Sequence, residues 1–278
     1  MKKIAFLFLT IRDVNFPEIW DKYLANNEDK YSIYIHPKYP NETKWRTDRI
    51  IKNLKETAWG FITRAYVELF KEAIQDPDNF KFITISESCI PIQSFDRLYN
   101  AMISDPRSWI KLMKITKYKF EVVLNKKTGN YIHHYARMSL NRHHVKQLLL
   151  NRDKLEFFYQ MQISDEYFFS ILYPLSNYKD VEITFDDWEY VAKQVKELKN
   201  QIKLLYEEQE QNNNIDNTDK INILQDKIKD IAKNPKSITK VKEDLEQIKN
   251  CKAFFYRKFP IGSDIEKYWQ EIIDYHNK

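Results

Sequence analysis

Residues 4–10 read IAFLFLT, a continuous apolar run that starts almost at the first residue. A run of this length without polar alternation is typical of a strand buried on both faces, as in the centre of a parallel sheet. Two further strands are predicted at 31–35 and 80–86, and they alternate with helices predicted at 16–24 and 59–74. This order predicts an α/β fold with a central, mostly parallel sheet flanked by helices.

The remainder of the chain adds shorter elements. Residues 109–128 are a basic and aromatic stretch to which the pattern assigns no element. Apolar spacing predicts helices at 95–103, 142–150 and 165–172, strands at 136–140 and 181–185, and a loop or strand at 253–259.

Composition supports a folded protein and excludes some classes of site. The chain has 278 residues, 43% of them hydrophobic and 15% aromatic, which is enough for a substantial core. It contains only 3 Gly, so Gly-rich phosphate loops are excluded. The net charge of +5 arises from 45 basic and 40 acidic residues, a balance that gives little reason to expect a nucleic-acid partner. We therefore expect none.

The two cysteines and the first residues bear on the compartment. Cys89 and Cys251 fit neither a zinc motif nor a disulfide framework, so reduced thiols in a cytoplasm-like compartment are expected. Lys2 and Lys3 precede an apolar run that is too short for a signal peptide. No segment is apolar enough to span a bilayer, and the expectation is a soluble protein without signal peptide, membrane anchor or integral membrane segment.

Residues 190–232 differ in kind from the rest, because they are rich in Lys, Glu, Gln and Asn and nearly free of aromatic residues. Apolar residues recur there at steps of three and four on either side of a polar cluster at 211–219. We predict an antiparallel coiled-coil helical hairpin inserted into a single domain formed by 1–189 and 233–278. The hairpin could join copies of the chain in a homo-oligomer, or it could be a solvated insertion. The two seams are Val191, Val195, Leu198, Ile202 and Leu205, and Ile221, Leu224, Ile228 and Ile231.

Ligands of such sheets bind at the carboxyl ends of the strands. Polar side chains follow each predicted strand at this edge, although they could equally cap the loops there. The candidates are Thr10, Arg12, His36, Ser86 and Glu87.

The sequence offers no metal site. Enzymes that hold a diphosphate through a divalent cation present two carboxylates as Asp-x-Asp near the end of a strand, and here residues 86–88 read Ser-Glu-Ser. The Asp-x-Asp at 76–78 precedes a strand and is interpreted as a turn, and Asp186 and Asp187 as a surface pair. The pairs at 133–134 and 143–144 are adjacent histidines, which point to opposite faces of a strand. We expect no metal.

Fixed cations would then have to neutralise a bound diphosphate. Arg257 and Lys258 lie within an aromatic stretch and are the best candidates, although a strand with exposed basic residues is an alternative. Asp165 and Glu166 open the aromatic run 167–169, so one carboxylate should lie beside a hydrophobic face, where burial raises its pKa and makes it a better base. For Asp165 a helix N-cap is the favoured alternative.

Taken together, these segments resemble glycosyltransferase family 14, which includes the core-2/I-branching β-1,6-N-acetylglucosaminyltransferases, and especially its plant and microbial branch. Their order and spacing match over most of the chain outside 190–232. The most specific is the SESCIP segment at 86–91. The resemblance rests on KIAFLFLT (3–10), YSIYIHP (31–37), WG (59–60), FITISESCIPI (82–92), SDE (164–166) and FYRKF (255–259).

The resemblance implies a GT-A-like domain, a nucleotide-sugar donor such as a UDP-sugar, inversion at the anomeric carbon and no metal cofactor. Glu166 falls on the catalytic base of the family, and Lys258 on a basic residue that holds the donor diphosphate. We expect Arg257 and the strand-end residues on the donor side, and a glycan acceptor near Asp165 and Trp188. Trp188 falls near an acceptor-binding tryptophan, although a core position is equally compatible with its spacing.

The chain also departs from the family. Characterised mammalian members use a second diphosphate-binding arginine upstream of the lysine, and here the insertion obscures its counterpart. Arg257, Lys236, Lys240 or Lys242 could take its place. Mammalian and plant relatives carry a membrane anchor and luminal disulfides, and we expect neither here. The transferred sugar could be N-acetylglucosamine or xylose. The alternative function is a non-catalytic interaction or assembly protein on a degenerate glycosyltransferase fold that uses the hairpin.

Overall fold

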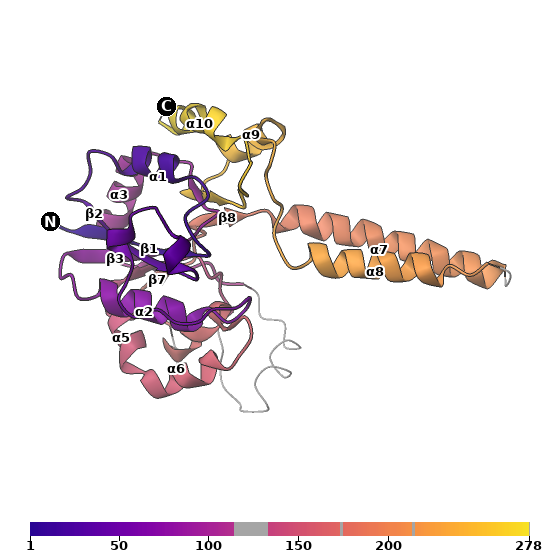
Figure 1. Cartoon of the computed structure of the whole chain (residues 1–278), viewed down its shortest axis with the longest axis horizontal. Coiled ribbons are helices and arrows are strands. Elements are labelled where there is room, and N and C mark those ends of the chain that lie inside the picture. The colour runs from indigo at the N-terminus through magenta and orange to yellow at the C-terminus, as the bar shows by residue number, and fades with distance from the viewer. Residues whose placement is uncertain (114–132, 173–174, 213–214, 278) are drawn as a thin grey trace.

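The computed structural model describes residues 1–113, 133–172, 175–212 and 215–277, so 114–128 of the unassigned stretch lie outside it. The main feature is a six-stranded sheet with the strand order β2-β1-β3-β6-β5-β7. Helices cover this sheet on both sides (Figure 1). Its strands are β1 (Lys3–Thr10), β2 (Tyr31–Pro37), β3 (Asn79–Ser86), β5 (Ser108–Trp109), β6 (Ser139–Asn141) and β7 (Tyr178–Lys179).

The sheet is mostly parallel, as the sequence predicts. β1 pairs in parallel with both β2 and β3, so that Phe6 lies opposite Ile33 on one side and Ile83 on the other. β6 runs antiparallel to its neighbours β3 and β5, and β5 is parallel to β7. The carboxyl ends of β1, β2 and β3 therefore meet at one edge of the sheet.

The apolar run of β1 is continuous because both of its faces are buried. Ile4, Phe6 and Phe8 belong to one hydrophobic cluster, whereas Ala5 and Leu7 belong to a second cluster across the sheet. Full burial of a Phe side chain contributes about 1.5–3 kcal/mol. The first cluster packs under α1 (Pro17–Leu24), α3 (Phe95–Ser104), α9 (Val241–Lys249) and α10 (Trp269–His276), and the second under α2 (Thr63–Ala73), α5 (Arg142–Leu150) and α6 (Arg152–Tyr159) (Figure 1).

A second, three-stranded sheet joins segments that are far apart in the sequence. Its central strand β9 (Phe255–Arg257) pairs antiparallel with β4 (Ile90–Pro91) and in parallel with β8 (Thr184–Asp186). β4 follows shortly after β3 and therefore lies near the carboxyl edge of the large sheet. Because β9 pairs with β4, the end of β9 lies near the same edge.

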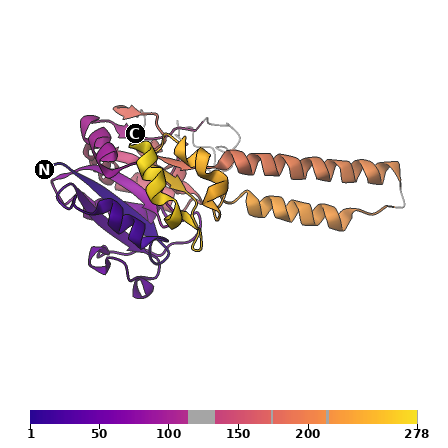
Figure 2. The ribbon, with the colours of Figure 1, turned by 90° about the horizontal axis from the view of Figure 1, so that it is seen from above.

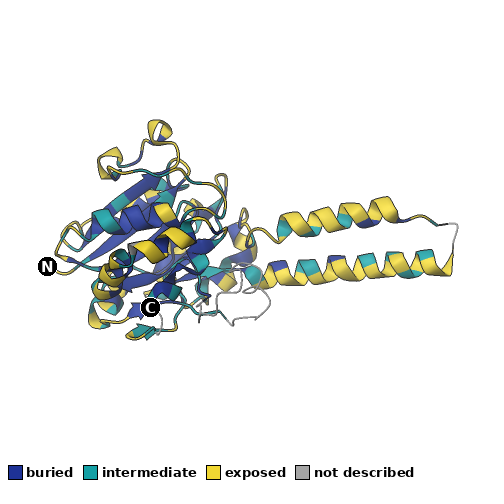
Figure 3. Ribbon diagram, turned by 90° about the horizontal axis from the view of Figure 1, so that it is seen from below, coloured by how far each residue is buried: buried dark blue, intermediate teal, exposed yellow. Residues whose placement is uncertain are grey.

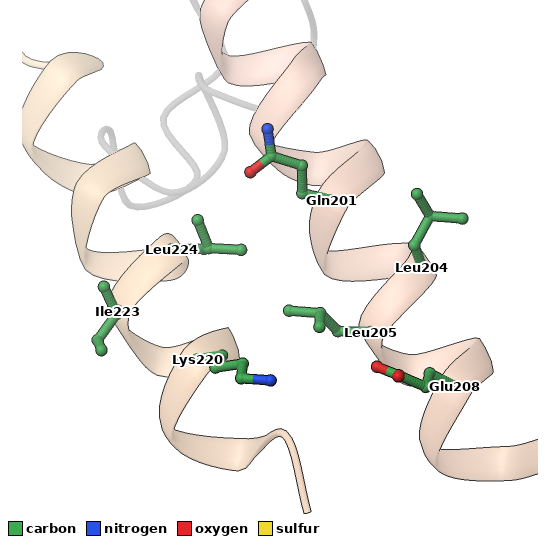
Figure 4. Close-up of a pocket in the computed structure, with 7 residues that line it drawn as sticks. All are labelled: Gln201, Leu204, Leu205, Glu208, Lys220, Ile223 and Leu224. Carbon is green, nitrogen blue, oxygen red and sulfur yellow. The ribbon is translucent and has the colours of Figure 1, made fainter. Parts of the chain in front are cut away.

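Two helices, α7 (Trp188–Gln211) and α8 (Thr218–Ile231), lie side by side and project from the domain (Figures 1 and 2). We call them the helical arm. Their mutual contacts bury Leu198 and Ile221, and Figure 4 shows Leu205 and Leu224 between the two helices. Most of the arm surface is exposed (Figure 3). Helices thus occur where the hairpin is predicted. That they pack as a coiled coil, and that they are an insertion into the domain, stay predictions.

Two predicted helices differ from the observed ones. The helix predicted at 59–74 begins only at Thr63, because Gly60 has a φ of 77° and forms a turn. The helix predicted at 165–172 is broken at Tyr167, whose φ is −132°, so that two 3-10 segments replace it. The 3-10 helices are η1 (Pro40–Glu42), η2 (Thr47–Arg49), η3 (Ser164–Glu166), η4 (Phe168–Leu172) and η5 (Ile265–Lys267).

Candidate active site

The loops that follow β1, β3 and β9 are tied together at the carboxyl edge of the sheet. The backbone N–H of Ile11 donates to Glu87 Oε2 at 2.8 Å, and that of Asn15 donates to the Glu87 carbonyl oxygen at 2.9 Å. The Phe259 N–H donates to the Ser88 carbonyl at 3.1 Å. These bonds place Glu87 and the residues after β9 in one constellation, which local sequence patterns alone do not reveal.

Arg257 lies at the end of β9 and is buried there. Its Nη1 donates to Asp186 Oδ2 at 3.3 Å, because the two residues are register partners in β9 and β8. Burial lowers the pKa of Arg257, and the nearby charge of Arg137 lowers it further. The basic residue is therefore held inside the site, unlike the alternative of an exposed basic strand.

The Asp186–Asp187 pair corrects the prediction of a surface pair. The Asp186 side chain is 7% exposed and binds Arg257, and Asp187 accepts a hydrogen bond from the Tyr190 N–H at 3.0 Å. Asp187 therefore caps α7. Both carboxylates are buried because each has a specific partner.

Arg137 is a functional candidate that the sequence analysis misses. Burial disfavours its charge, but Tyr66, Asp186 and Asp165 are close enough to raise its pKa above the ordinary value. Its buried Nε has no hydrogen-bond partner in the described part of the chain. One charge-assisted donor of Arg137 is therefore unused among the described residues. A basic residue two positions before the short strand β6 is the only signal in the sequence.

Lys258 completes a group of three basic residues, Arg137, Arg257 and Lys258, which we call the cation cluster. Lys258 Nζ donates to Asn234 Oδ1 at 2.8 Å. Burial and the charge of Arg257 lower the pKa of Lys258, whereas Glu87 acts in the opposite direction. Burial also raises the pKa of Glu87 in spite of these cations.

The buried carboxylate of the Asp165–Glu166 pair is Asp165. It is 6% exposed, and burial raises its pKa to about 6 although Arg137 opposes the shift. Asp165 lies inside η3, and the residue that precedes η3 is Ile163, so the N-cap interpretation is wrong. The charges of Arg137, Arg257 and Glu166 all act on Asp165, which connects the carboxylate pair with the cation cluster.

Glu166 faces outward from η3, with 31% of its side chain exposed. Its Oε2 lies 2.9 Å from His133 Nε2, and the imidazole of His133 stacks on Tyr167 with a centroid distance of 4.5 Å. The carboxylate is thereby held by a partner that is itself fixed. The Glu166 carboxylate is therefore accessible, while the neighbouring Asp165 carboxylate is buried.

His134 points away from this group. It is fully buried against Phe168 and Phe169, and burial lowers its pKa to about 4, so that the ring is neutral. The backbone N–H of His134 donates to the Glu166 carbonyl oxygen at 2.9 Å. The two adjacent histidines therefore point in different directions, as their spacing predicts.

The remaining residues named from the sequence have local partners. Thr10 Oγ1 donates to the Arg12 carbonyl at 2.6 Å, and the exposed Arg12 guanidinium is paired with Glu42. His36 is fully buried, and its Nε2 accepts from the Lys55 N–H at 2.9 Å. The expected roles of Thr10, Arg12 and His36 in binding the donor nucleotide stay predictions. Ser86 Oγ lies 3.1 Å from Cys89 Sγ, and Trp188 is half-buried as the first residue of α7.

Two of the lysines considered for the second cation are engaged elsewhere. Lys236 is paired with Asp244, and its ammonium lies 4.7 Å from the centroid of the Tyr190 ring. Lys240 Nζ lies 3.9 Å from Glu243, with 76% of the lysine side chain exposed. Arg137 is the basic residue whose charge is coupled to both Asp165 and Arg257.

Two absences within the described ranges concern metal binding and membrane spanning. Within 1–113, 133–172, 175–212 and 215–277, no group of three or more His, Cys, Asp or Glu residues could hold a metal ion. No helix in these ranges is long and apolar enough to cross a membrane.

Comparisons with known proteins agree with the resemblance. A family model described as "Branch: Core-2/I-Branching enzyme" matches residues 4–200, which include Arg137 and Glu166, whereas Arg257 and Lys258 lie beyond the match. Glycosyltransferase BC10 of Oryza sativa subsp. japonica is 26% identical over 126 residues. This alignment covers 41% of the chain and 31% of the rice protein, so the chain spans about a third of that relative.

Among solved structures, the crystal structure of A197 from STIV aligns with 10% identity and a TM-score of 0.28. The alignment covers 52% of this chain and 68% of that one. This likeness is too slight to bear on fold or function.

Proposed function

The chain belongs to the core-2/I-branching enzyme family, and we propose that it is a glycosyltransferase that moves a sugar from a UDP-sugar to a hydroxyl group of a glycan acceptor. The observation that carries this proposal is the charge network in which the accessible Glu166 carboxylate adjoins the cation cluster through Asp165. A base for the acceptor and cations for the leaving diphosphate are the two groups that such a transfer needs.

Glu166 acts as the general base. It takes the proton from the acceptor hydroxyl while that oxygen attacks the anomeric carbon from the face opposite the nucleotide. The bond to the diphosphate oxygen breaks, and its electron pair leaves with UDP, so a single displacement inverts the centre. His133 holds the carboxylate at 2.9 Å and limits its rotation. One base suffices here, whereas glycoside hydrolysis uses two carboxyl groups.

The cation cluster stabilises the departing diphosphate. Arg137, Arg257 and Lys258 are basic groups whose charges act on one another within a partly buried site, and such groups interact more strongly with an anion than they would in water. Fixed cations in this place are the reason to propose a metal-independent, GT-A-like enzyme. Asp165 and Trp188 are assigned to the acceptor side, and N-acetylglucosamine and xylose are the candidate sugars.

The test is a panel of UDP-sugars with the purified chain in the presence of EDTA. We expect UDP release from at least one donor, and restoration of activity only by Mn²⁺ would contradict the metal-independent mechanism. Calorimetry should show that Arg137→Met weakens UDP binding about 10-fold or more, as expected for loss of a charge-assisted contact. Arg49→Met is the matched control, because Arg49 is exposed and paired only with its neighbour Asp48 in the described chain.

The helical arm favours a second candidate function, a non-catalytic assembly protein. Leu204 and Ile223 are 63% and 66% exposed on the arm, and together with Leu205 and Leu224 they line a groove (Figure 4). A homo-oligomer formed through this groove would dissociate when Leu204 is replaced by Glu. If sedimentation shows such dissociation and no donor is turned over, the assembly function replaces the enzymatic one.

A further inference from the structure

Trp59 is an exposed tryptophan in a tight turn. The Phe61 N–H donates to the Ala58 carbonyl at 2.9 Å, and Gly60 between them has a φ of 77°. Trp59 is 59% exposed, and Phe61 is 42% exposed.

The turn is fixed to η3, which carries Glu166. The Ile163 N–H donates to the Gly60 carbonyl at 2.6 Å, and the hydroxyls of Thr63 and Ser164 lie 2.6 Å apart. A Cβ atom at Gly60 would lie 2.7 Å from Gln162 Cγ, so only glycine allows this close approach. Trp59 is thus anchored on the segment that leads directly into the proposed base.

The turn also lies at the carboxyl edge of the sheet. α2 begins three residues after Gly60 and packs on β1, β2 and β3. Because α2 leads into β3 and runs against it, the first turn of α2 lies near the carboxyl end of that strand. Glu87 lies at the same edge, one residue beyond β3.

From these contacts we propose that Trp59 is a stacking platform for the pyranose ring of the acceptor. The proposal rests on the proposed function and extends it to a subsite for a sugar. One face of a pyranose presents C–H groups, which the electron-rich face of an indole attracts. The backbone of the turn is held by hydrogen bonds, so it need not be ordered when a sugar binds to the exposed indole.

The position of Trp59 relative to Glu166 indicates whether the ring stacked on Trp59 belongs to the acceptor or to the nucleotide sugar. Arg257 is the last residue of β9 and Lys258 follows it, whereas the turn is hydrogen-bonded to Ile163, the residue before the η3 segment that contains Glu166. The acceptor hydroxyl must meet Glu166 on the face opposite the leaving nucleotide. A ring stacked on Trp59 would therefore be the acceptor ring.

Saturation-transfer NMR on the full chain with excess UDP tests the proposal. The probes are the methyl β-glycosides of galactose, glucose, xylose and N-acetylglucosamine. For at least one probe we expect signal transfer to ring C–H protons, a decrease of about 5-fold or more in Trp59→Ala, and partial retention in Trp59→Phe. Phe157→Ala is the control, because Phe157 is an aromatic residue of α6 that is 42% exposed.

Each outcome decides one question. Equal transfer in the wild type and Trp59→Ala, or no transfer to any probe, overturns the platform. Calorimetric titration of UDP into the same proteins separates this result from the proposed function: UDP binding without dependence on Trp59 overturns only the platform. Circular dichroism of Trp59→Ala should match the wild type, since the side chain is exposed.

Discussion

The α/β domain and the helical arm both repeat apolar residues regularly, but they bury them to different extents. Phe6 and Phe8 of β1 are fully buried, whereas Leu204 and Ile223 of the arm are 63% and 66% exposed. The ribbon of the arm is mostly exposed, in contrast to the interior of the domain (Figure 3). The sheet has helices on both faces, while each helix of the arm has one neighbour. Two helices enclose their seam only in part, because Leu198 and Ile221 are buried but Leu205 and Leu224 are half-buried, so the arm gains less stability from each apolar residue.

The residues proposed for the chemistry also belong to the domain and not to the arm. The carboxylates and the cation cluster belong to the domain, and the arm approaches them only at its root, where Asp187 caps α7 and Asp186 binds Arg257. Stability and the site therefore depend on the packed domain, and the arm should be separable from both.

The largest expected effect comes from the domain core. Trp20 is fully buried, and its ring contacts Phe8 at a centroid distance of 4.9 Å and Phe255 at 5.9 Å. Trp20→Ala should lower the free energy of unfolding by about 3–5 kcal/mol. Leu204→Ala in the arm should change it by about 0.5 kcal/mol or less. Urea unfolding measures both, and equal effects would contradict the contrast between the regions.

An effect of intermediate size concerns the buried carboxylate. The pKa of Asp165 in the folded chain is about 6, above its ordinary value of 3.8, so the native state binds this proton more tightly than the unfolded chain. The resulting stabilisation is complete below pH 3.8 and is lost as the pH rises through 6. A difference of roughly two pH units corresponds to about 3 kcal/mol.

Asp165→Asn removes this titration. We therefore expect the variant to gain about 3 kcal/mol relative to the wild type between pH 4 and pH 7.5, measured by urea unfolding at each pH. His134, with its pKa lowered to about 4 by burial, titrates in the opposite sense but in both proteins, so the difference isolates Asp165. A pH-independent difference would contradict the assignment of the buried charge.

The smallest effect is expected when the arm is shortened. Replacing residues 195–228 by a short Gly/Ser linker keeps the root, where the Lys236 N–H donates to the Asp187 carbonyl at 3.2 Å. The free energy of unfolding of the domain should change by less than about 1 kcal/mol, and UDP affinity by less than about two-fold. Loss of UDP binding would show that the arm belongs to the site.

Local patterns predict the elements that local forces determine. The run at 4–10 identifies β1 because continuous apolar character is needed when both faces are buried, and helical spacing locates α1, α3 and α5. The breaks are harder to predict, since the positive φ of Gly60 and Ile163 depends on the contact between their two loops. The turn before α2 and the 3-10 segment at Glu166 result from that contact.

Long-range pairing explains what sequence reasoning misses in the site. Adjacent acidic residues usually lie on the surface, but Asp186 is buried because β9 brings Arg257 opposite to it from 71 positions away. Arg137 becomes a candidate only when the chain before β6 is placed near Asp165 and Arg257. The prediction for Glu166 could be made because a family pattern identifies the position.

The most direct test of the central claim compares Glu166→Gln with the wild type at a saturating UDP-sugar concentration. Loss of the general base should lower turnover about 100-fold or more, while the affinity for UDP stays within about two-fold. Glu156→Gln, which changes an exposed glutamate of α6, should behave like the wild type in both measurements. Near-normal turnover in Glu166→Gln would contradict the account.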